Sequence, residues 1–76
     1  MLENRVIEVI SKTLNIPNEE INLSTGPNSL AEWDSLGHIS IISNLETEFG
    51  IYFPIDVIIE LKNVSDITQY LSTIVK

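Results

Sequence analysis

The side chains best suited to chemistry lie in one short stretch, residues 33–39, which reads Trp-Asp-Ser-Leu-Gly-His-Ile. Ser35 places a hydroxyl after an acid, where a polar segment changes into an amphipathic helical pattern. His38 is the only histidine, so a serine nucleophile with a histidine base would have to use this pair. No oxyanion donor is identifiable beside the pair. The stretch therefore favours a hydroxyl that accepts an attached group, and the alternative is a serine that only caps a helix.

Composition excludes several other functions. Eleven acidic and four basic residues give a net charge of −7, which repels nucleic acids and anionic membranes and attracts basic protein surfaces. The chain has no cysteine, so disulfides and thiolate metal sites are excluded, and any thioester would need sulfur from an added group. The acids do not have calcium-loop spacing, and we expect no metal site.

The length and hydropathy of the chain indicate a small globular protein. It has 76 residues, of which 43% are hydrophobic and 20% charged, enough apolar material for one small core. We expect one domain over residues 1–76 and a monomer. No apolar run approaches the roughly 18 residues of a membrane span, and the first residues do not read as a signal peptide. A cytoplasmic location is the expectation.

Hydrophobic periodicity predicts helices at residues 3–14 and 35–48. Asp34 or Ser35 would cap the second, and Gly50 would end it. A last helix would be capped by Ser65 or Asp66. Residues 53–61 suit a strand or a short helix equally. The core side of the second helix would comprise Ile41, Ile42, Leu45 and Phe49, and that of the last helix Ile67, Tyr70, Leu71 and Ile74. The long segment between the first two helices would be held to the core by Ile16, Ile21, Leu23 and Leu30.

A longer block extends around the serine and resembles the acyl carrier proteins in residue order and spacing. It comprises Leu30, Trp33, Asp34, Ser35, Leu36, His38, Leu45, Glu46, Glu48, Phe49, Ile51, Phe53 and Pro54. The resemblance implies an all-α fold, a small four-helix bundle with three longer helices and a short third one. It implies that Ser35 carries 4′-phosphopantetheine, transferred from coenzyme A and holding acyl groups as thioesters. It also implies that Asp34 is recognised by the phosphopantetheinyl transferase, and that the protein carries without catalysing.

The same resemblance predicts a surface for partners. Acyl-loading, acyl-transfer or condensing enzymes with basic patches would dock on Leu36, Ile39, Glu46, Glu48 and Asp56. From the density of isoleucines, we also expect a cleft for a hydrophobic cargo between the second and third helices, lined by Ile39, Ile58 and Ile59. The middle of the second helix, residues 37–44, has no acid, unlike typical fatty-acid carriers. This departure favours a specialised lipid, polyketide or surface-glycan pathway.

Two alternatives remain open. The cargo could be aminoacyl or peptidyl, or the protein could be a helical interaction module without a prosthetic group. Among the neighbours of Ser35, we expect Trp33 to cover the core and His38 to lie at the surface or cap region. Gly37 would either admit a close-approaching partner or arm, or be neutral.

Overall fold

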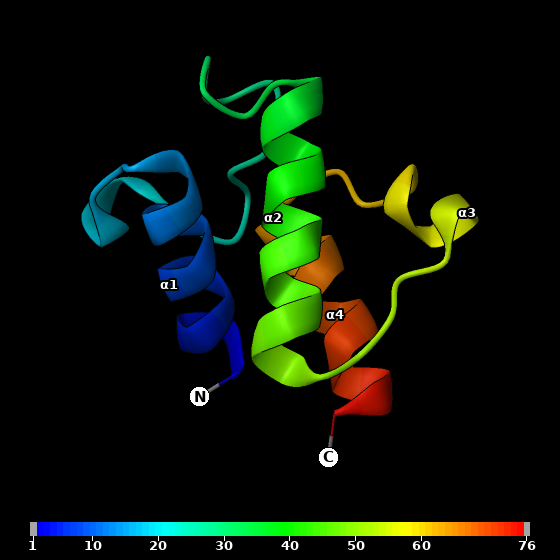
Figure 1. Ribbon diagram of the computed structural model, residues 1–76. Helices are drawn as coiled ribbons and strands as arrows, with labels where there is room; N and C mark the ends of the chain where they lie inside the picture. Colours follow the sequence, from blue (N-terminus) through cyan, green and yellow to red (C-terminus); the bar gives the residue numbers. More distant parts are fainter. Residues whose placement is uncertain (1, 76) are drawn as a thin grey trace.

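The protein is built from helices, and the computed structural model describes residues 2–75. The elements are α1 (Leu2–Leu14), the 3-10 turn η1 (Asn18–Glu20), α2 (Ser35–Phe49), α3 (Ile55–Ile58) and α4 (Val64–Ile74), shown in Figure 1. Within residues 2–75 there is no strand. The predicted fold class is therefore confirmed, and the ambiguous segment at residues 53–61 contains a short helix.

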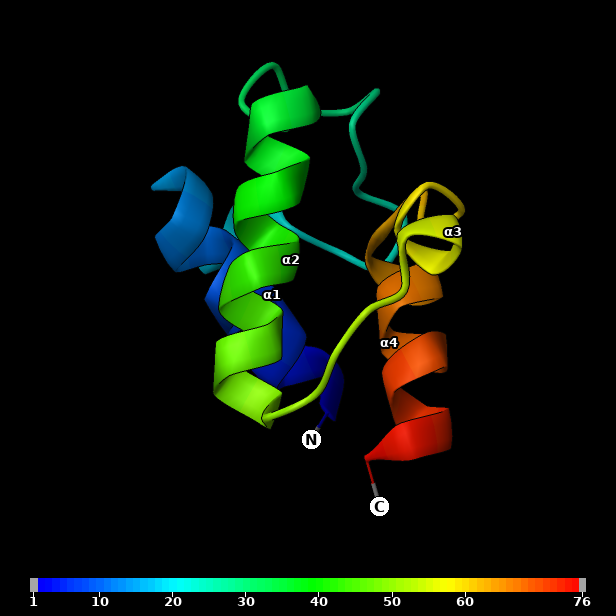
Figure 2. The same cartoon turned by 45° about the vertical axis from the view of Figure 1, so that its right-hand side comes forward.

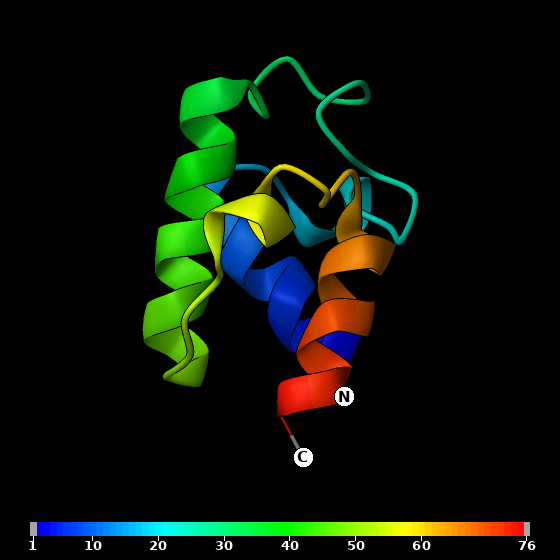
Figure 3. The same cartoon turned by 90° about the vertical axis from the view of Figure 1, so that its right-hand side faces the viewer.

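Three helices run along one another, and the short helix α3 lies to one side of α2 and α4 in Figure 1. α2 and α4 run in roughly the same direction, and α1 runs against them (Figures 1 and 2). Viewed from the side, α3 lies between α2 and α4 (Figure 3). The buried side chains form one core cluster, whose members are Val6, Ile10, Ile16, Ile21, Trp33, Ile41, Ile42, Leu45, Phe53, Leu61, Val64, Ile67 and Leu71.

Helix α1 ends at a left-handed residue. Asn15 has φ of 58°, and the Ile16 N–H donates to the Ser11 carbonyl at 3.0 Å, which satisfies one of the carbonyls left open at the helix end. The predicted end of this helix at residue 14 is confirmed. Asparagine tolerates the left-handed conformation better than most residues, so Asn15 makes the turn itself.

Helix α2 is delimited by two residues that the sequence singled out. Asp34 is the N-cap, and its Oδ1 accepts from the Gly37 N–H at 2.8 Å. Gly50 has φ of 64° and ψ of 40°, the left-handed conformation that ends many helices. The predicted core side is confirmed, because Ile41, Ile42 and Leu45 are buried and Phe49 packs partly buried against the core.

The predicted cap of the last helix is wrong. The cap is Asn63, whose Oδ1 accepts from the Asp66 N–H at 2.8 Å. Asp66 lies in the first turn, and its Oδ2 accepts from the Lys62 N–H at 2.9 Å. Because the two side chains satisfy backbone donors reciprocally, the arrangement resembles a capping box. Of the predicted inner side, Ile67 and Leu71 are buried, whereas Ile74 is exposed.

The long segment before α2 is held down by both side chains and backbone. Ile16 and Ile21 are buried as predicted, and Leu30 packs partly buried against the core. The prediction is wrong for Leu23, whose side chain is 44% exposed. Instead its carbonyl accepts from the Ser65 N–H at 2.9 Å, and the Thr25 carbonyl accepts from Val64 at the same distance. These bonds tie the segment to the first turn of α4.

Candidate functional site

Ser35 is the first residue of α2, and its side chain is exposed. The backbone N–H groups of a first helical turn have no partners within the helix, and the helix dipole makes this end positive. A phosphodiester on the serine would therefore lie in a favourable field. Asp34 supplies the cap, so the serine hydroxyl is not needed to start the helix.

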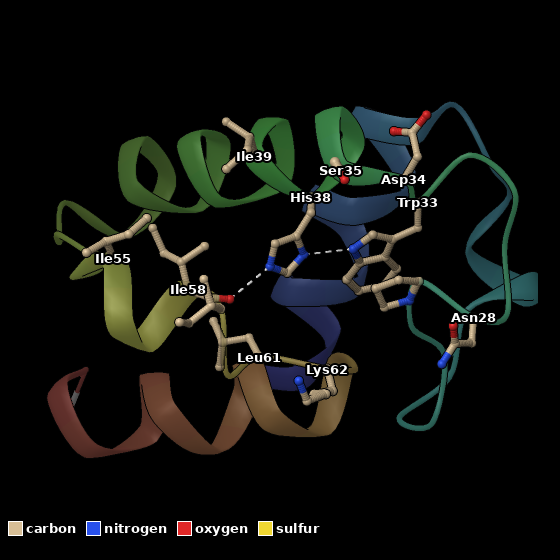
Figure 4. Close-up of a pocket in the computed structure, with 12 residues that line it drawn as sticks. Asn28, Trp33, Asp34, Ser35, His38, Ile39, Ile55, Ile58, Leu61 and Lys62 are labelled. Atoms are coloured by element: carbon tan, nitrogen blue, oxygen red, sulfur yellow. Dashed lines mark hydrogen bonds between the residues drawn. The ribbon is translucent and has the colours of Figure 1, made fainter.

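A surface cavity of about 690 Å³ opens beside this serine, between α2, α3 and the segment before α2 (Figure 4). Its lining residues are Pro27, Asn28, Trp33, Asp34, Ser35, His38, Ile39, Ile55, Ile58, Ile59, Leu61 and Lys62. In Figure 4 the isoleucines lie toward α3, while Asp34 and Asn28 lie at the other end. The cavity thus has an apolar part and a polar part, with Ser35 among the polar residues.

The three isoleucines predicted to form a cleft all line this one cavity. They are Ile39 on α2, Ile58 in α3 and Ile59 directly after α3. Sequence reasoning missed Ile55, which lies in the same lining and is 68% exposed. Its position directly after Pro54, at the start of α3, could have indicated that it shares this surface. Leu36 is 76% exposed but lies outside the lining.

The inner wall of the cavity includes two rings that lie edge to edge, those of Trp33 and His38. The Trp33 indole Nε1–H donates to His38 Nδ1 at 2.9 Å, and the ring centroids lie 6.1 Å apart. Because Nδ1 accepts, the imidazole proton belongs on Nε2, which donates to the Ile58 carbonyl at 3.1 Å. The chain Trp33–His38–Ile58 therefore connects the segment before α2, α2 itself and α3 (Figure 4).

This arrangement corrects one expectation and confirms another. His38 is not a surface or cap residue, since it is partly buried and both ring nitrogens have partners inside the protein. Trp33 belongs to the core as predicted, with 0% exposure. A buried indole N–H generally needs an acceptor, and this requirement was the signal that could have assigned His38 its role.

The same hydrogen bonds argue against nucleophilic catalysis by Ser35 and His38. A histidine base needs a free lone pair to take the serine proton. In His38 the lone pair on Nδ1 accepts from Trp33, and Nε2 donates to a carbonyl. Neither nitrogen is available to Ser35 in this structure, so the histidine serves the architecture.

Gly37 is explained by packing inside the protein. A Cβ at this position would come within 2.5 Å of the Glu32 carbonyl oxygen and 3.3 Å of a Leu14 methyl group. We expected Gly37 either to admit a close-approaching partner or arm or to be neutral. This geometry gives it a different role, in packing within the protein. The absent side chain lets the segment before α2 fold back against the first turn of the helix.

The acidic residues predicted for docking are distributed over different parts of the surface. Asp56 is exposed in α3. The Glu46 carboxylate is half-buried and accepts from the Phe53 N–H at 2.9 Å, which holds the segment after α2. Glu48 forms an ion pair with Arg5 of α1 at 3.2 Å. Nine residues separate Glu48 from Ile39, which places them on opposite sides of α2. The structure therefore does not bring these acids together around Ser35.

Two further properties concern the whole described chain. Among residues 2–75, no group of three or more histidine, aspartate or glutamate side chains could hold a metal ion. Over the same residues, no helix has the length and hydropathy needed to span a membrane.

Comparisons with known proteins agree on one family. A family model described as "Phosphopantetheine attachment site" matches residues 4–71. The acyl carrier protein of Rickettsia canadensis (strain McKiel) is 31% identical over 70 residues, which cover 92% of this chain and 81% of that protein. The acyl carrier protein of Azobacteroides pseudotrichonymphae genomovar. CFP2 is 33% identical over 73 residues, covering 95% and 86%. The segment matched by the family model includes Ser35 and all the residues that line the cavity.

Proposed function

This chain belongs to the acyl carrier protein family, whose prosthetic group is covalently bound 4′-phosphopantetheine, and from that membership we propose that Ser35 is the attachment residue. The observation that carries the proposal is the position of Ser35. Its hydroxyl is exposed at the first residue of α2, at the edge of the cavity that would receive the cargo. The bound group supplies a terminal thiol, which this cysteine-free chain lacks.

Attachment requires a phosphopantetheinyl transferase and coenzyme A. The Ser35 oxygen forms a bond to the phosphorus that bears pantetheine, and the bond from that phosphorus to the leaving phosphate oxygen breaks. Adenosine 3′,5′-bisphosphate leaves with the electron pair, and the serine proton passes to a base on the transferase. Nothing is oxidised or reduced. The chain itself contributes an exposed hydroxyl and the positive end of α2.

The surface that partner enzymes would read extends from the first turns of α2 to α3. Leu36 and Ile39 are 76% and 52% exposed on α2, and Asp56 is exposed on α3. Exposed apolar side chains with an acid on the next helix suit a partner with an apolar patch and basic neighbours. Because Glu46 holds the Phe53 N–H and Glu48 lies on the opposite side of α2 from Ile39, we restrict the proposed docking surface to Leu36, Ile39 and Asp56.

The cavity would receive an acyl group at the end of the arm. Ile39, Ile58 and Ile59 line its apolar part, and each methylene that they cover would contribute about 0.8 kcal/mol. The segment from residue 37 to residue 44 has no acid, so we propose a specialised lipid, polyketide or surface-glycan pathway whose enzymes use apolar contacts. The alternative is an aminoacyl or peptidyl cargo. In that case an adenylating enzyme should load the arm with an amino acid.

Intact mass spectrometry tests the attachment residue. The protein is incubated with coenzyme A, magnesium and a broad-specificity transferase, beside the Ser35→Ala and Ser43→Ala variants. Ser43 is an exposed serine on the same helix and serves as the matched control. We expect one phosphopantetheinyl group on the wild type and on Ser43→Ala, and none on Ser35→Ala. Modification of folded Ser35→Ala would overturn the proposal.

A further inference from the structure

We propose that His38 closes the inner wall of the cavity and keeps the cargo on its outer side, against the isoleucines. This inference rests on the proposed carrier function and deepens it, because it concerns where the acyl group lies. His38 lines the cavity, and Figure 4 shows its ring between Trp33 and Ile58. Trp33 and Leu61 line the cavity and also belong to the core cluster, so the hydrogen-bonded rings stand beside Leu61 between the cavity and the core.

The closure consists of polar groups bonded to one another, and the Ile58 carbonyl also accepts from the Leu61 N–H at 3.3 Å. The indole N–H, the two imidazole nitrogens and the Ile58 carbonyl are joined by two hydrogen bonds, of 2.9 and 3.1 Å. An acyl chain that entered the core between α2 and α3 would have to separate the His38 ring from Ile58. A hydrocarbon chain offers these groups no replacement partner, and unpaired polar groups are unfavourable in an apolar interior.

The bond to Ile58 also helps to hold α3 in place, together with the packing of Val57 and Ile58 against the core. Among residues 2–75, it is the one hydrogen bond that joins α3 to another helix; the other hydrogen bonds of α3 lie within residues 54–61. A helix of four residues gains little stability from its own turns, so its position depends on such contacts. His38 is therefore a positioning residue for the α3 side of the cavity.

The outer side of the cavity can receive a group without any such rearrangement. Ile39, Ile55 and Ile59 are 52%, 68% and 65% exposed, so a cargo lying on them covers apolar surface that already faces water. Each methylene placed against these side chains gains contact without separating the His38 ring from Ile58. The structure therefore favours a cargo that lies along the isoleucines on the outer side of the cavity.

Side-chain NMR on loaded protein tests the location of the chain. Transferase attaches arms that end in butyryl, octanoyl or dodecanoyl groups through a hydrolysis-resistant amide, and intact mass verifies each product. Three sets of signals are followed: the Trp33 indole N–H, the cavity methyls of Ile39, Ile58 and Ile59, and the core methyls of Ile10, Leu45 and Ile67. We expect the cavity methyls to shift with butyryl. The indole and core signals should keep their positions for all three chains.

Shifts of the indole and core signals that grow with chain length in the wild type would overturn the inference. The same measurement on the His38→Ala variant is a second test. In that variant we expect the dodecanoyl chain to shift the core methyl signals. Ser43→Ala is the control and should behave like the wild type. Core signals that stay unmoved in folded His38→Ala would show that another group closes the wall. If His38→Ala does not fold, the wild-type series still decides whether the chain enters the core. Absence of any arm on Ser35 is a separate result, which would contradict the proposed function itself.

Discussion

The indole of Trp33 donates a hydrogen bond of 2.9 Å to Nδ1 of His38, across the residue at which α2 begins. Trp33 is fully buried and precedes the helix, whereas His38 lies in its first turns. The bond selects the imidazole tautomer that can donate to Ile58. One histidine thus links the core, the helix that begins at Ser35 and the short helix that borders the cavity.

Replacing His38 with alanine should destabilise the protein. The change removes both hydrogen bonds and leaves the buried Trp33 N–H without an acceptor, while the Ile58 carbonyl keeps the Leu61 N–H at 3.3 Å. Because an unsatisfied buried group costs about 1–3 kcal/mol, we expect the free energy of unfolding to fall by about 2 kcal/mol. Urea denaturation measures this, with Ser43→Ala as the control. A loss no larger than that of the control would contradict the structural role of His38.

Replacing Ser35 with alanine should abolish modification and leave the stability of the protein almost unchanged. Ser35 is the first helical residue, and the cap is supplied by Asp34. We therefore expect the free energy of unfolding to change by no more than about 0.5 kcal/mol, as for other surface positions, while transfer of phosphopantetheine is lost. Thermal denaturation and intact mass report the two properties. A loss of stability typical of a cap, with no phosphopantetheine added to the wild type either, would favour the interaction module.

Two substitutions of Asp34 distinguish its role as the N-cap of α2 from a role of its negative charge in recognition by the transferase. An asparagine side chain keeps an oxygen that can accept from the Gly37 N–H, so Asp34→Asn should retain most of the stability. Asp34→Ala removes the oxygen and should cost about 1 kcal/mol. If the transferase recognises the carboxylate, both variants should be modified more slowly than the wild type. Wild-type rates for Asp34→Asn would confine Asp34 to capping.

Replacing Gly37 with alanine should destabilise α2, although alanine is the better helix former. The intrinsic gain is about 1 kcal/mol, but the new methyl group would lie 2.5 Å from the Glu32 carbonyl oxygen. Relieving this contact must move backbone, and we expect a net loss of about 1–3 kcal/mol. Urea denaturation beside Ser43→Ala checks the sign. Increased stability would show that the segment before α2 adapts easily.

Replacing Leu36 with alanine should weaken partner binding without affecting the fold. Its side chain is 76% exposed, so the free energy of unfolding should change by no more than about 0.5 kcal/mol. We expect a higher KM of the transferase for the carrier and little change in kcat, because the contact contributes to binding alone. Leu23→Ala removes another exposed leucine away from the cavity and is the matched control. Equal KM values for the two variants would remove Leu36 from the docking surface.

Much of the helical framework and the location of Ser35 could be predicted because the signals are local. The apolar side of α2, the cap at Asp34 and the stop at Gly50 depend on residues a few positions apart. The strand-like composition of residues 53–61 did not settle their structure by itself. There the resemblance to acyl carrier proteins favoured the short helix that the structure contains.

By itself, the sequence determined the helical pattern, the acidic charge, the lack of a thiol and the serine that stands where a helix starts. Only the tertiary structure decided which neighbours complete the site. His38 reaches Ile58 across twenty positions, Glu48 pairs with Arg5 across 43, and the Glu32 carbonyl excludes any side chain at Gly37. The physical reason is that these roles depend on the positions of donors, acceptors and free space, which are fixed only once the chain has packed.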